Sequence, residues 1–506
     1  MQRKSRKCVK ILALEGVLMY IKESKEQLMF KDFYLPFGGR LDVKNRWIQL
    51  ANLIPWDDFE EEYAKNFSED NIGAPAKPFR MALGSEIIKR KLDISDEEVV
   101  EQIRENPYLQ YFIGLESYRN ESPFDASMMT HFRKRLNLDL LNSLNDKIIE
   151  NENKKKELKK TELSGIVKEI ENSGQLLLDA TCIPQDIRYP TDLSLLNEAR
   201  EKTELIIDKL HIANENKVKK PRTYRKLARK SYLSIAKQRK KNKRVVRNGI
   251  KKQLGYIRRN LKIIENQSKV VNTVCLSSRD LRNLSVCKDV FRQQEEMYTN
   301  KSVRIDNRIV SISQPYVRPI VRGKAGVDVE FDSKLMISVI CGYCRIEKLS
   351  WDNYNECVFL KSSVERFKEY YGCYPASVLV DKIFRTRENI NYCKEHCIRL
   401  SGAALGRPSK DVDKSLESRK QIIQDGRDRI PVEGKFGNCK RKYGLNHIYA
   451  KRKDTSECEI AMGILLLNLC KVQRAYIFVI CIIIIIPIIQ HIKRFLENQT
   501  HFFRKL

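Results

Sequence analysis

Two aspartates in this sequence of 506 residues follow short apolar runs of the kind that form buried strands. Asp179 follows GQLLL and Asp381 follows PASVLV. If the two strands are neighbours in one sheet, their carboxylates can meet, and a third carboxylate from a packed helix would complete a site made only of oxygen ligands. Such a site suits two Mg²⁺ ions, which together activate an attacking oxygen and stabilise a leaving oxygen in phosphoryl transfer.

Four other acids compete for the same role. Asp186 and Asp192 lie shortly after Asp179, and Asp328 and Asp332 precede the next strand pair. Any of them could be a metal ligand. Asp179 is preferred because it ends the most apolar strand of its region, where a metal site can be rigid and partly dry.

The order of the elements predicts the fold that must position these acids. After Asp179 comes an insertion, then KLMISVIC and YCRIEKLSW, which predict a hairpin around Gly342. A strand ending in Asp381, a helix-like stretch (RTRENINYCKEH), a short strand (CIRLSGA) and a further helix follow. This order predicts an α/β fold with a ribonuclease H-like mixed sheet, interrupted by a basic, mainly helical insertion and preceded by an all-α N-terminal domain.

The charge of the chain indicates its partner. The net charge is +30 and the pI is near 9.5, which builds a field that attracts polyanions. Residues 217–262 hold 20 Lys and Arg and no acid, so this block is either solvated or paired with anions. Lys240, Lys241 and Arg244 are candidate phosphate contacts. Tyrosines at 224, 232 and 256 could stack on bases or simply pack.

A second basic segment lies in the N-terminal region, which is expected to be mostly helical. Ser95 should cap one helix and Asp125 another. In the second helix the apolar residues recur at helical spacing, while Arg133, Lys134 and Arg135 fall largely between them. This basic face is either solvated or a contact to a DNA backbone or groove.

The cysteines and the two termini indicate the compartment in which the protein is expected. The 14 cysteines are scattered through a long chain without a convincing secretory leader, which favours a reduced cytosolic state. Cys341, Cys344, Cys393 and Cys397 have only a loose zinc-site spacing, so zinc is not favoured. The apolar run at 475–489 has 15 residues, fewer than the roughly 17 to 25 that a membrane span needs, so a membrane anchor is not expected.

Several long segments together resemble the DDE transposases of bacterial insertion sequences. They are LLLDATCIPQDIRYPTDLSLLNEAR, LVDKIFRTRENINYCKEHCIRLSGAALGRP and RIPVEGKFGNCKRKYGLNHIYAKRKDTSE. The segment YIKESKEQLMFKDFYLPFGGRL is similar to the helical N-terminal domain of that family. The resemblance covers roughly residues 19 to 470 and implies Asp179, Asp381 and Glu433 as the three catalytic, metal-binding acids.

The last family motif also implies a DNA-contacting Arg and Lys, here Arg429 and Lys440. Helical spacing puts Lys440 on the face of Glu433, where it could hold a DNA phosphate, although a solvated lysine is the other reading. The sequence departs from the family twice. The Tyr that opens the related motif would fall at Gly426, and Pro431 is expected to start the helix, leaving Arg429 just outside it.

The resemblance implies an enzyme that cleaves the ends of an insertion sequence and joins their 3′ hydroxyls to target DNA. Two Mg²⁺ ions, which Mn²⁺ could replace, would serve both steps. The expected partner is double-stranded DNA, as terminal inverted repeats and target, with a homodimer on DNA and no small-molecule substrate. A cytoplasmic, nucleoid-associated protein is expected. The alternatives are an inactive or repurposed DNA-binding protein, a ribonuclease H-like nuclease that never joins, and, more remotely, a membrane-associated basic protein.

The expected domain organisation follows the same segments. A possible non-native extension (1–18) precedes the helical DNA-end-binding domain. This helical domain is expected at 19–150. The first part of the catalytic domain is expected at 170–192, the basic insertion at 193–320, the second part of the catalytic domain at 321–470, and an Ile-rich tail at 471–506.

Overall fold

The computed structural model describes most of the chain and divides it into two compact units. The described residues are 33–35, 39–67, 75–161, 172–213, 219–270, 275–324, 327–403 and 412–475. One unit contains Met1–Ile166 and Ala461–Leu506, and the other contains Val167–Ile460. The expected extension at 1–18 and the apolar run after Ala475 lie outside the described residues. Within the described part, no helix combines the length and the apolar character that crossing a membrane requires.

The first unit is helical, as the sequence predicts. Its helices are α1 (Arg46–Ala51), α2 (Glu60–Ala64), α3 (Phe79–Leu92), α4 (Asp96–Glu105), α5 (Pro107–Phe112), α6 (Met128–Arg135) and α7 (Leu138–Thr161). The Ser95 side chain caps α4 by accepting a hydrogen bond from the Glu98 N–H. Asp125 instead lies before the cap residue of α6, which is Ser127, and accepts from the Ser127 N–H.

The C-terminal part of the described chain joins this helical unit. Residues 453–475 are helical, and those from Ala461 onward group with the N-terminal helices. The Asn468 amide donates to Asn145 Oδ1 at 2.7 Å, and the Gln473 amide donates to the Arg46 carbonyl at 2.6 Å. Polar contacts therefore fix a helix from the end of the chain against helices from its start.

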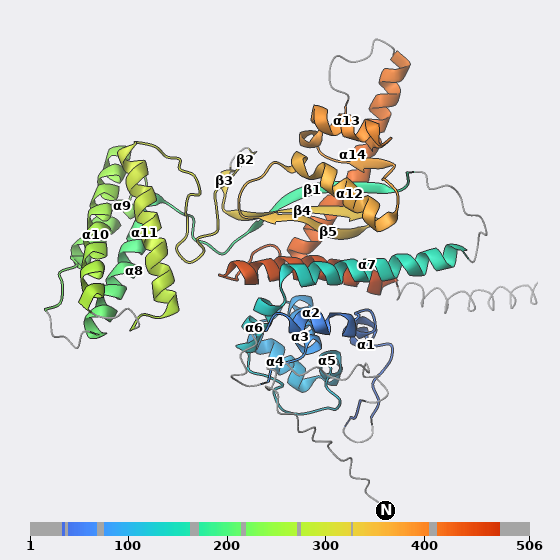
Figure 1. The fold of residues 1–506 in the computed structure, drawn as a ribbon, viewed down its shortest axis with the longest axis horizontal. Helices are drawn as coiled ribbons and strands as arrows, with labels where there is room; N and C mark the ends of the chain where they lie inside the picture. Colours follow the sequence, from blue (N-terminus) through green and yellow to red (C-terminus); the bar gives the residue numbers. More distant parts are fainter. Residues whose placement is uncertain are drawn as a thin grey trace, which may run out of the picture. The chain divides into compact units, whose positions relative to one another are not determined.

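The second unit is built on a five-stranded mixed sheet (Figure 1). Its strands are β1 (Gln175–Pro184), β4 (Asp332–Ile340), β5 (Tyr343–Ser350), β6 (Ser377–Leu379) and β7 (Arg399–Leu400), in the order β5-β4-β1-β6-β7. β1 pairs antiparallel with β4 and parallel with β6, and β6 pairs parallel with β7. The predicted ribonuclease H-like α/β arrangement is confirmed.

The hairpin between β4 and β5 turns at Cys341 and Gly342, with Ile340 paired to Tyr343. Both turn residues have positive φ, 51° and 75°, as a two-residue hairpin turn of type I′ requires. Cys341 is thus a turn residue. Cys344 and Cys393 are buried while Cys341 and Cys397 are exposed, so the four cysteines do not share one environment.

Helices cover both faces of the sheet. Leu176, Leu178 and Ala180 of β1 pack with α12 (Leu360–Tyr371) and with Phe384. Side chains alternate along a strand, so Leu177, Asp179 and Thr181 point to the opposite face, where α14 (Val412–Lys442) packs on β1 and β6. α13 (Arg387–Glu395) lies between β6 and β7 in the chain.

The basic insertion forms a helical bundle, as expected. Its helices are α8 (Asp192–Ala213), α9 (Arg225–Ala236), α10 (Lys243–Val270) and α11 (Ser278–Thr299). Leu196, Ala199, Ile257 and Cys287 are fully buried in its core. Strands β2 (Ile320–Lys324) and β3 (Val327–Glu330) pair with each other and lead from the insertion back to β4.

Candidate active site

The sequence predicted Asp179 at the end of its strand. In the structure it lies in the middle of β1. Parallel pairing with β6 stops at Leu177 opposite Leu379, whereas antiparallel pairing with β4 continues to Pro184. Beyond Leu177, the pairing of β1 with the described strands is along its β4 edge. Asp381 follows β6 by two residues, at the position that continues the register to Asp179, so the two aspartates lie at neighbouring strand positions on one face.

The environment of Asp179 disfavours its charge. The pKa of Asp179 is raised to about 6, chiefly because the carboxyl group is buried; the Ala180 N–H and Arg429 oppose this rise, and the Glu356 and Asp381 carboxylates contribute to it. Glu356 was not singled out from the sequence. It begins a short 3-10 helix, Glu356–Phe359, after the hairpin, and nothing in its local pattern marks it. A cation beside Asp179 would stabilise its carboxylate form.

α14 brings the third segment to the site and begins well before Pro431, which corrects the expected start. The helix runs from Val412 to Lys442 with Pro431 inside it, so Arg429 is helical. Pro431 cannot donate to the carbonyl four residues back, but Val432, Phe436 and Cys439 are buried just beyond it. This packing holds the helix together across the proline.

Two basic side chains of α14 contact the sheet at the site. Arg429 Nη1 donates to Asp381 Oδ1 at 3.2 Å, and Lys440 Nζ donates to Thr181 Oγ1 at 3.1 Å. Thr181 is two residues beyond Asp179, on the same face of β1. The two contacts therefore bracket Asp179 and Asp381 from the same helix.

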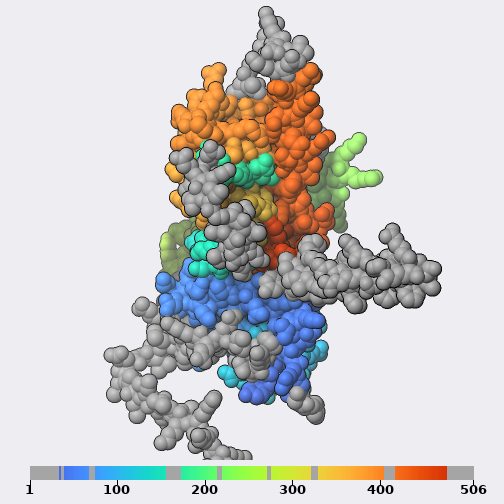
Figure 2. Space-filling model, turned by 90° about the vertical axis from the view of Figure 1, so that its right-hand side faces the viewer, coloured from blue at the N-terminus to red at the C-terminus, as the bar shows by residue number. Residues whose placement is uncertain are grey.

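Glu433 lies between these two contacts along α14. Arg429, Glu433 and Lys440 are spaced by four and seven residues, which puts them on one face of the helix. Glu433 is exposed, and α14 is visible in orange along the surface in Figure 2. Among the described residues, the ligand atoms of Asp179, Asp381 and Glu433 do not lie within 4.8 Å of one another as a set. Asp381 is close enough to Asp179 to raise its pKa, and Glu433 lies on α14 between the residues that contact Asp381 and Thr181.

The donor set fits Mg²⁺. Asp179, Asp381 and Glu433 offer only carboxylate oxygens, which Mg²⁺ prefers. Arg429 already supplies a positive charge to Asp381, whose side chain is 61% exposed, so this carboxylate is accessible and is paired with a cation.

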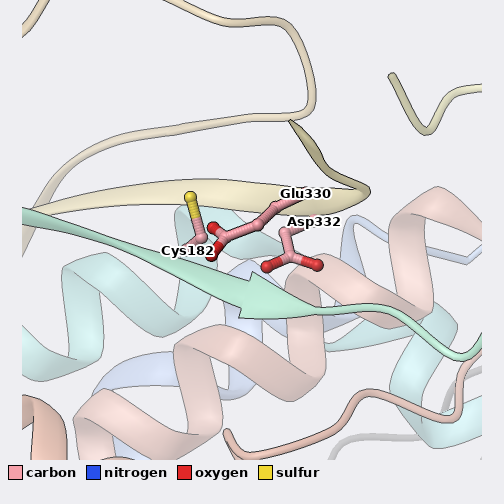
Figure 3. Close-up of side chains that lie close together, drawn as sticks. All are labelled: Cys182, Glu330 and Asp332. Carbon is pink, nitrogen blue, oxygen red and sulfur yellow. The ribbon is translucent and has the colours of Figure 1, made fainter. Parts of the chain in front are cut away.

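A second group of metal-ligand side chains lies on the other face of β1 (Figure 3). One ligand atom each from Cys182, Glu330 and Asp332 lies within 4.8 Å of the others. Cys182 comes from β1, Glu330 from the end of β3 and Asp332 from the start of β4. Asp332 was among the competing acids in the sequence. Its partners could not be foreseen, because the β3–β4 corner brings Glu330 and Asp332 to Cys182 only in the folded chain.

Two other competing acids are engaged elsewhere. Asp186 pairs with Lys451 and with His447 Nε2, the latter at 3.3 Å. Asp192 accepts hydrogen bonds from Arg308 and from the Gln294 amide. The fourth, Asp328, belongs to a stretch whose side chains are not described.

The basic residues predicted on α6 separate into different roles. Arg133 is 7% exposed, and its guanidinium is bound by Glu86 at 2.9 Å and by Asp96 at 2.7 Å. It therefore stabilises the helical unit internally, which overturns its assignment as a DNA contact. Arg135 stacks over the Phe67 ring at 4.2 Å, while Lys134 is exposed.

The predicted contacts of the insertion are all at its surface. Lys240, Lys241 and Arg244 are exposed where α9 turns into α10. Arg259 of α10 lies over the ring of Tyr224 at 4.6 Å and over that of Tyr256 at 5.8 Å. These two tyrosines are thus engaged by a cation within the bundle.

Comparisons with known proteins identify both the helical and the sheet regions. Residues 36–135 match the family model described as "Transposase domain (DUF772)", and residues 378–470 match that of "Transposase DDE domain". The second match contains Asp381 and Glu433 but begins after Asp179. The chain is also similar to "Uncharacterized protein ORF8 in nfe locus" of Rhizobium meliloti, with 34% identity over 167 residues, 32% of this chain and 75% of the relative. No solved structure matches. With a transposase domain on each side of the insertion, this chain belongs to the DDE transposase family.

Proposed function

We propose that this protein cleaves the ends of an insertion sequence and joins their 3′ hydroxyls to target DNA, with Asp179, Asp381 and Glu433 as metal ligands. The observation that carries the proposal is the proximity of Asp179 in β1 to Asp381, two residues after β6, together with the Arg429 contact to Asp381 and the Lys440 contact to Thr181 from α14. Two bound Mg²⁺ ions would activate the attacking oxygen and stabilise the leaving oxygen of the phosphodiester.

The residues of the chain have distinct tasks in this reaction. Asp179 is held in a strand and is partly buried, so its ionised carboxylate is unfavourable without a partner. A bound cation would stabilise that ionised form. Arg429 orients the exposed Asp381 carboxylate before the metal ions bind. Lys440, oriented by Thr181, provides a positive charge for a non-bridging phosphate oxygen of the DNA.

DNA recognition is assigned to two basic surfaces. The surface of the insertion contains Lys240, Lys241 and Arg244. The surface of the helical unit contains Lys134, and Arg135 contributes less because its guanidinium already stacks on Phe67. We expect a homodimer on DNA, because two ends must be joined in one reaction, and an association with the nucleoid follows from the charge.

The test is cleavage of a DNA fragment that carries the gene's own flanks, with Mg²⁺, Mn²⁺ or a chelator. The native chain should nick at defined ends with either metal and join the products to a target plasmid, whereas Asp179→Ala should bind with similar affinity and not cut. Lys451→Ala, which removes a cation that pairs with Asp186 outside the site, is the control and should cut normally. Cutting without joining would make the protein a nuclease, and binding without cutting would overturn the catalytic assignment.

A further inference from the structure

The insertion leaves the sheet and returns to it at one place, and Cys182, Glu330 and Asp332 meet there (Figure 3). β1 ends at Pro184 and β4 begins at Asp332, and these two residues are paired in the sheet. Helices α8 to α11 all lie between Cys182 and Glu330 in the chain. One ligand atom of each of the three side chains lies within 4.8 Å of the others. A group bound by all three would therefore link the two ends of the insertion.

Phe331 fixes the corner of the chain on which the two acids stand. Its ring packs against the buried cluster around Trp351 and meets the ring of Tyr189 edge to face, with 5.5 Å between the ring centroids. Glu330 and Asp332 flank Phe331 directly, so the packing of this ring limits the movement of both. The fold itself therefore holds the two carboxylates close to Cys182, as a preorganised metal site requires.

The three side chains offer ligands that Zn²⁺ binds. Cys182 is 3% exposed, while Glu330 and Asp332 are half-buried. Zn²⁺ binds thiolate and carboxylate ligands at about 2.0 to 2.3 Å, which puts the ligand atoms of a tetrahedral site roughly 3.3 to 3.8 Å apart. Small rotations of the side chains bring the group into this range. Mg²⁺ prefers oxygen ligands alone, so the thiol disfavours it here.

The charges at this corner also favour a bound dication. Lys334 stands opposite Cys182 in the register of β1 and β4. Its Nζ lies 2.9 Å from a carboxylate oxygen of Glu356 and donates to the Tyr354 carbonyl at 2.8 Å. This lysine thus serves a carboxylate outside the group. A thiolate and two carboxylates at such short separations repel one another, and a divalent cation among them would offset the repulsion.

We propose that Cys182, Glu330 and Asp332 bind one Zn²⁺ ion, with water completing its coordination, and that this ion fastens the base of the insertion to the sheet. The site is separate from the proposed active site, because Cys182 lies on the α12 face of β1 and Asp179 on the α14 face. The ion binds the folded chain and so stabilises it. This inference does not depend on the proposed function.

The experiment uses Co²⁺ as a spectroscopic substitute for Zn²⁺ on the full chain, kept reduced, stripped with chelator and dialysed. Binding to a thiolate gives a charge-transfer absorption in the near ultraviolet, which carboxylate ligands alone do not give. The native protein should develop this absorption with one Co²⁺ per chain, in the presence of excess Mg²⁺. Added Zn²⁺ should abolish it by displacement.

Variants assign the signal to the three residues. Cys182→Ser should lose the absorption, whereas Cys344→Ser, the matched control with a buried thiol on β5 of the same sheet, should keep it. Asp179→Ala should also keep it, which separates the two sites. Glu330→Gln changes a half-buried side chain and covers the case that Cys182→Ser fails to fold. It should weaken Zn²⁺ binding by at least about tenfold, as loss of even an outer-shell partner does.

Zn²⁺ should raise the thermal unfolding midpoint of the native protein and of Asp179→Ala, and raise that of Cys182→Ser much less. No charge-transfer absorption in the native protein, or an absorption of native strength in Cys182→Ser, would overturn the site. Equal loss in folded Cys182→Ser and Cys344→Ser would overturn its assignment to the β3–β4 corner.

Discussion

The two faces of β1 present two different groups of potential metal ligands. On one face, Asp179 stands beside Asp381, below a helix that carries Glu433, Arg429 and Lys440. On the other face, Cys182 meets Glu330 and Asp332 within 4.8 Å (Figure 3). The second group is the more compact one, but it includes a thiol, whereas the first has oxygen ligands alone and lies beside the Arg429 and Lys440 contacts.

This difference shows that convergence of ligands does not by itself identify a reactive site. A thiolate among the ligands favours zinc or another softer metal over Mg²⁺. A group for phosphoryl transfer must instead leave ligand positions for the substrate and keep cations nearby for its phosphates. The first face meets both conditions, because Glu433 and Asp381 are exposed, Arg429 contacts Asp381, and Lys440 contacts Thr181 two residues beyond Asp179.

The largest expected effect separates the two faces directly. Alanine at Asp179, Asp381 or Glu433 should reduce cleavage by at least about 10²- to 10³-fold, as for removal of a group that stabilises transition-state charge. Single-turnover cleavage of labelled DNA ends measures the loss. A variant that retains more than a tenth of the native rate would remove that residue from the ligand set.

The second prediction concerns pH. Because the pKa of Asp179 is raised to about 6, cleavage at subsaturating Mg²⁺ should fall as the pH drops below 6, by about tenfold per pH unit. Saturating Mg²⁺ should move the midpoint to lower pH, since the ion competes with the proton. A midpoint that is the same at all Mg²⁺ concentrations would show that another group controls the profile.

The same shift predicts a stability effect in the absence of metal. The folded protein holds the Asp179 proton more tightly than the unfolded chain, whose pKa is near 3.8. The contribution of this carboxyl to the free energy of unfolding therefore falls as the pH rises from about 4 to 6. Asp179→Asn should raise the unfolding free energy at pH 8 by about 1–3 kcal/mol, and by much less at pH 4. Thermal unfolding in chelator at both pH values measures this.

Lys440 and Arg429 should give intermediate effects. Lys440→Met should lower the cleavage rate about 10-fold to 100-fold, as loss of a positioned phosphate contact would, and weaken the dependence of DNA binding on salt. Arg429→Gln should lower the rate less, because its partner Asp381 keeps its place at the end of β6. A lysine variant with native rates would leave Lys440 as a purely structural contact to Thr181.

The smallest effect is expected on the second face. Cys182→Ser and Glu330→Gln should leave Mg²⁺-dependent cleavage within about twofold of native, because neither side chain lies on the face of Asp179. The same cleavage assay checks this, with thermal unfolding to confirm the fold. If either variant is as inactive as Asp179→Ala, the Cys182 group takes part in cleavage, and the distinction between the two faces of β1 is wrong.

The sequence determined most of the fold, because local patterns specify it. The apolar runs before Asp179 and Asp381 and the hairpin at Gly342 lie in the strands where alternation and turn chemistry predict them. The net charge and the 20 basic residues of 217–262 likewise indicated a polyanionic partner without any structure.

The tertiary structure alone decided which side chains meet. Arg133 looks like a surface cation in its helix, but Glu86, 47 residues away in the chain, buries it in an ion pair. Pro431 looks like a helix start, yet packing of Val432 and Phe436 extends α14 through it and turns Arg429 toward Asp381. The Cys182 group depends on strand register and on the β3–β4 corner, about which a local pattern has no information.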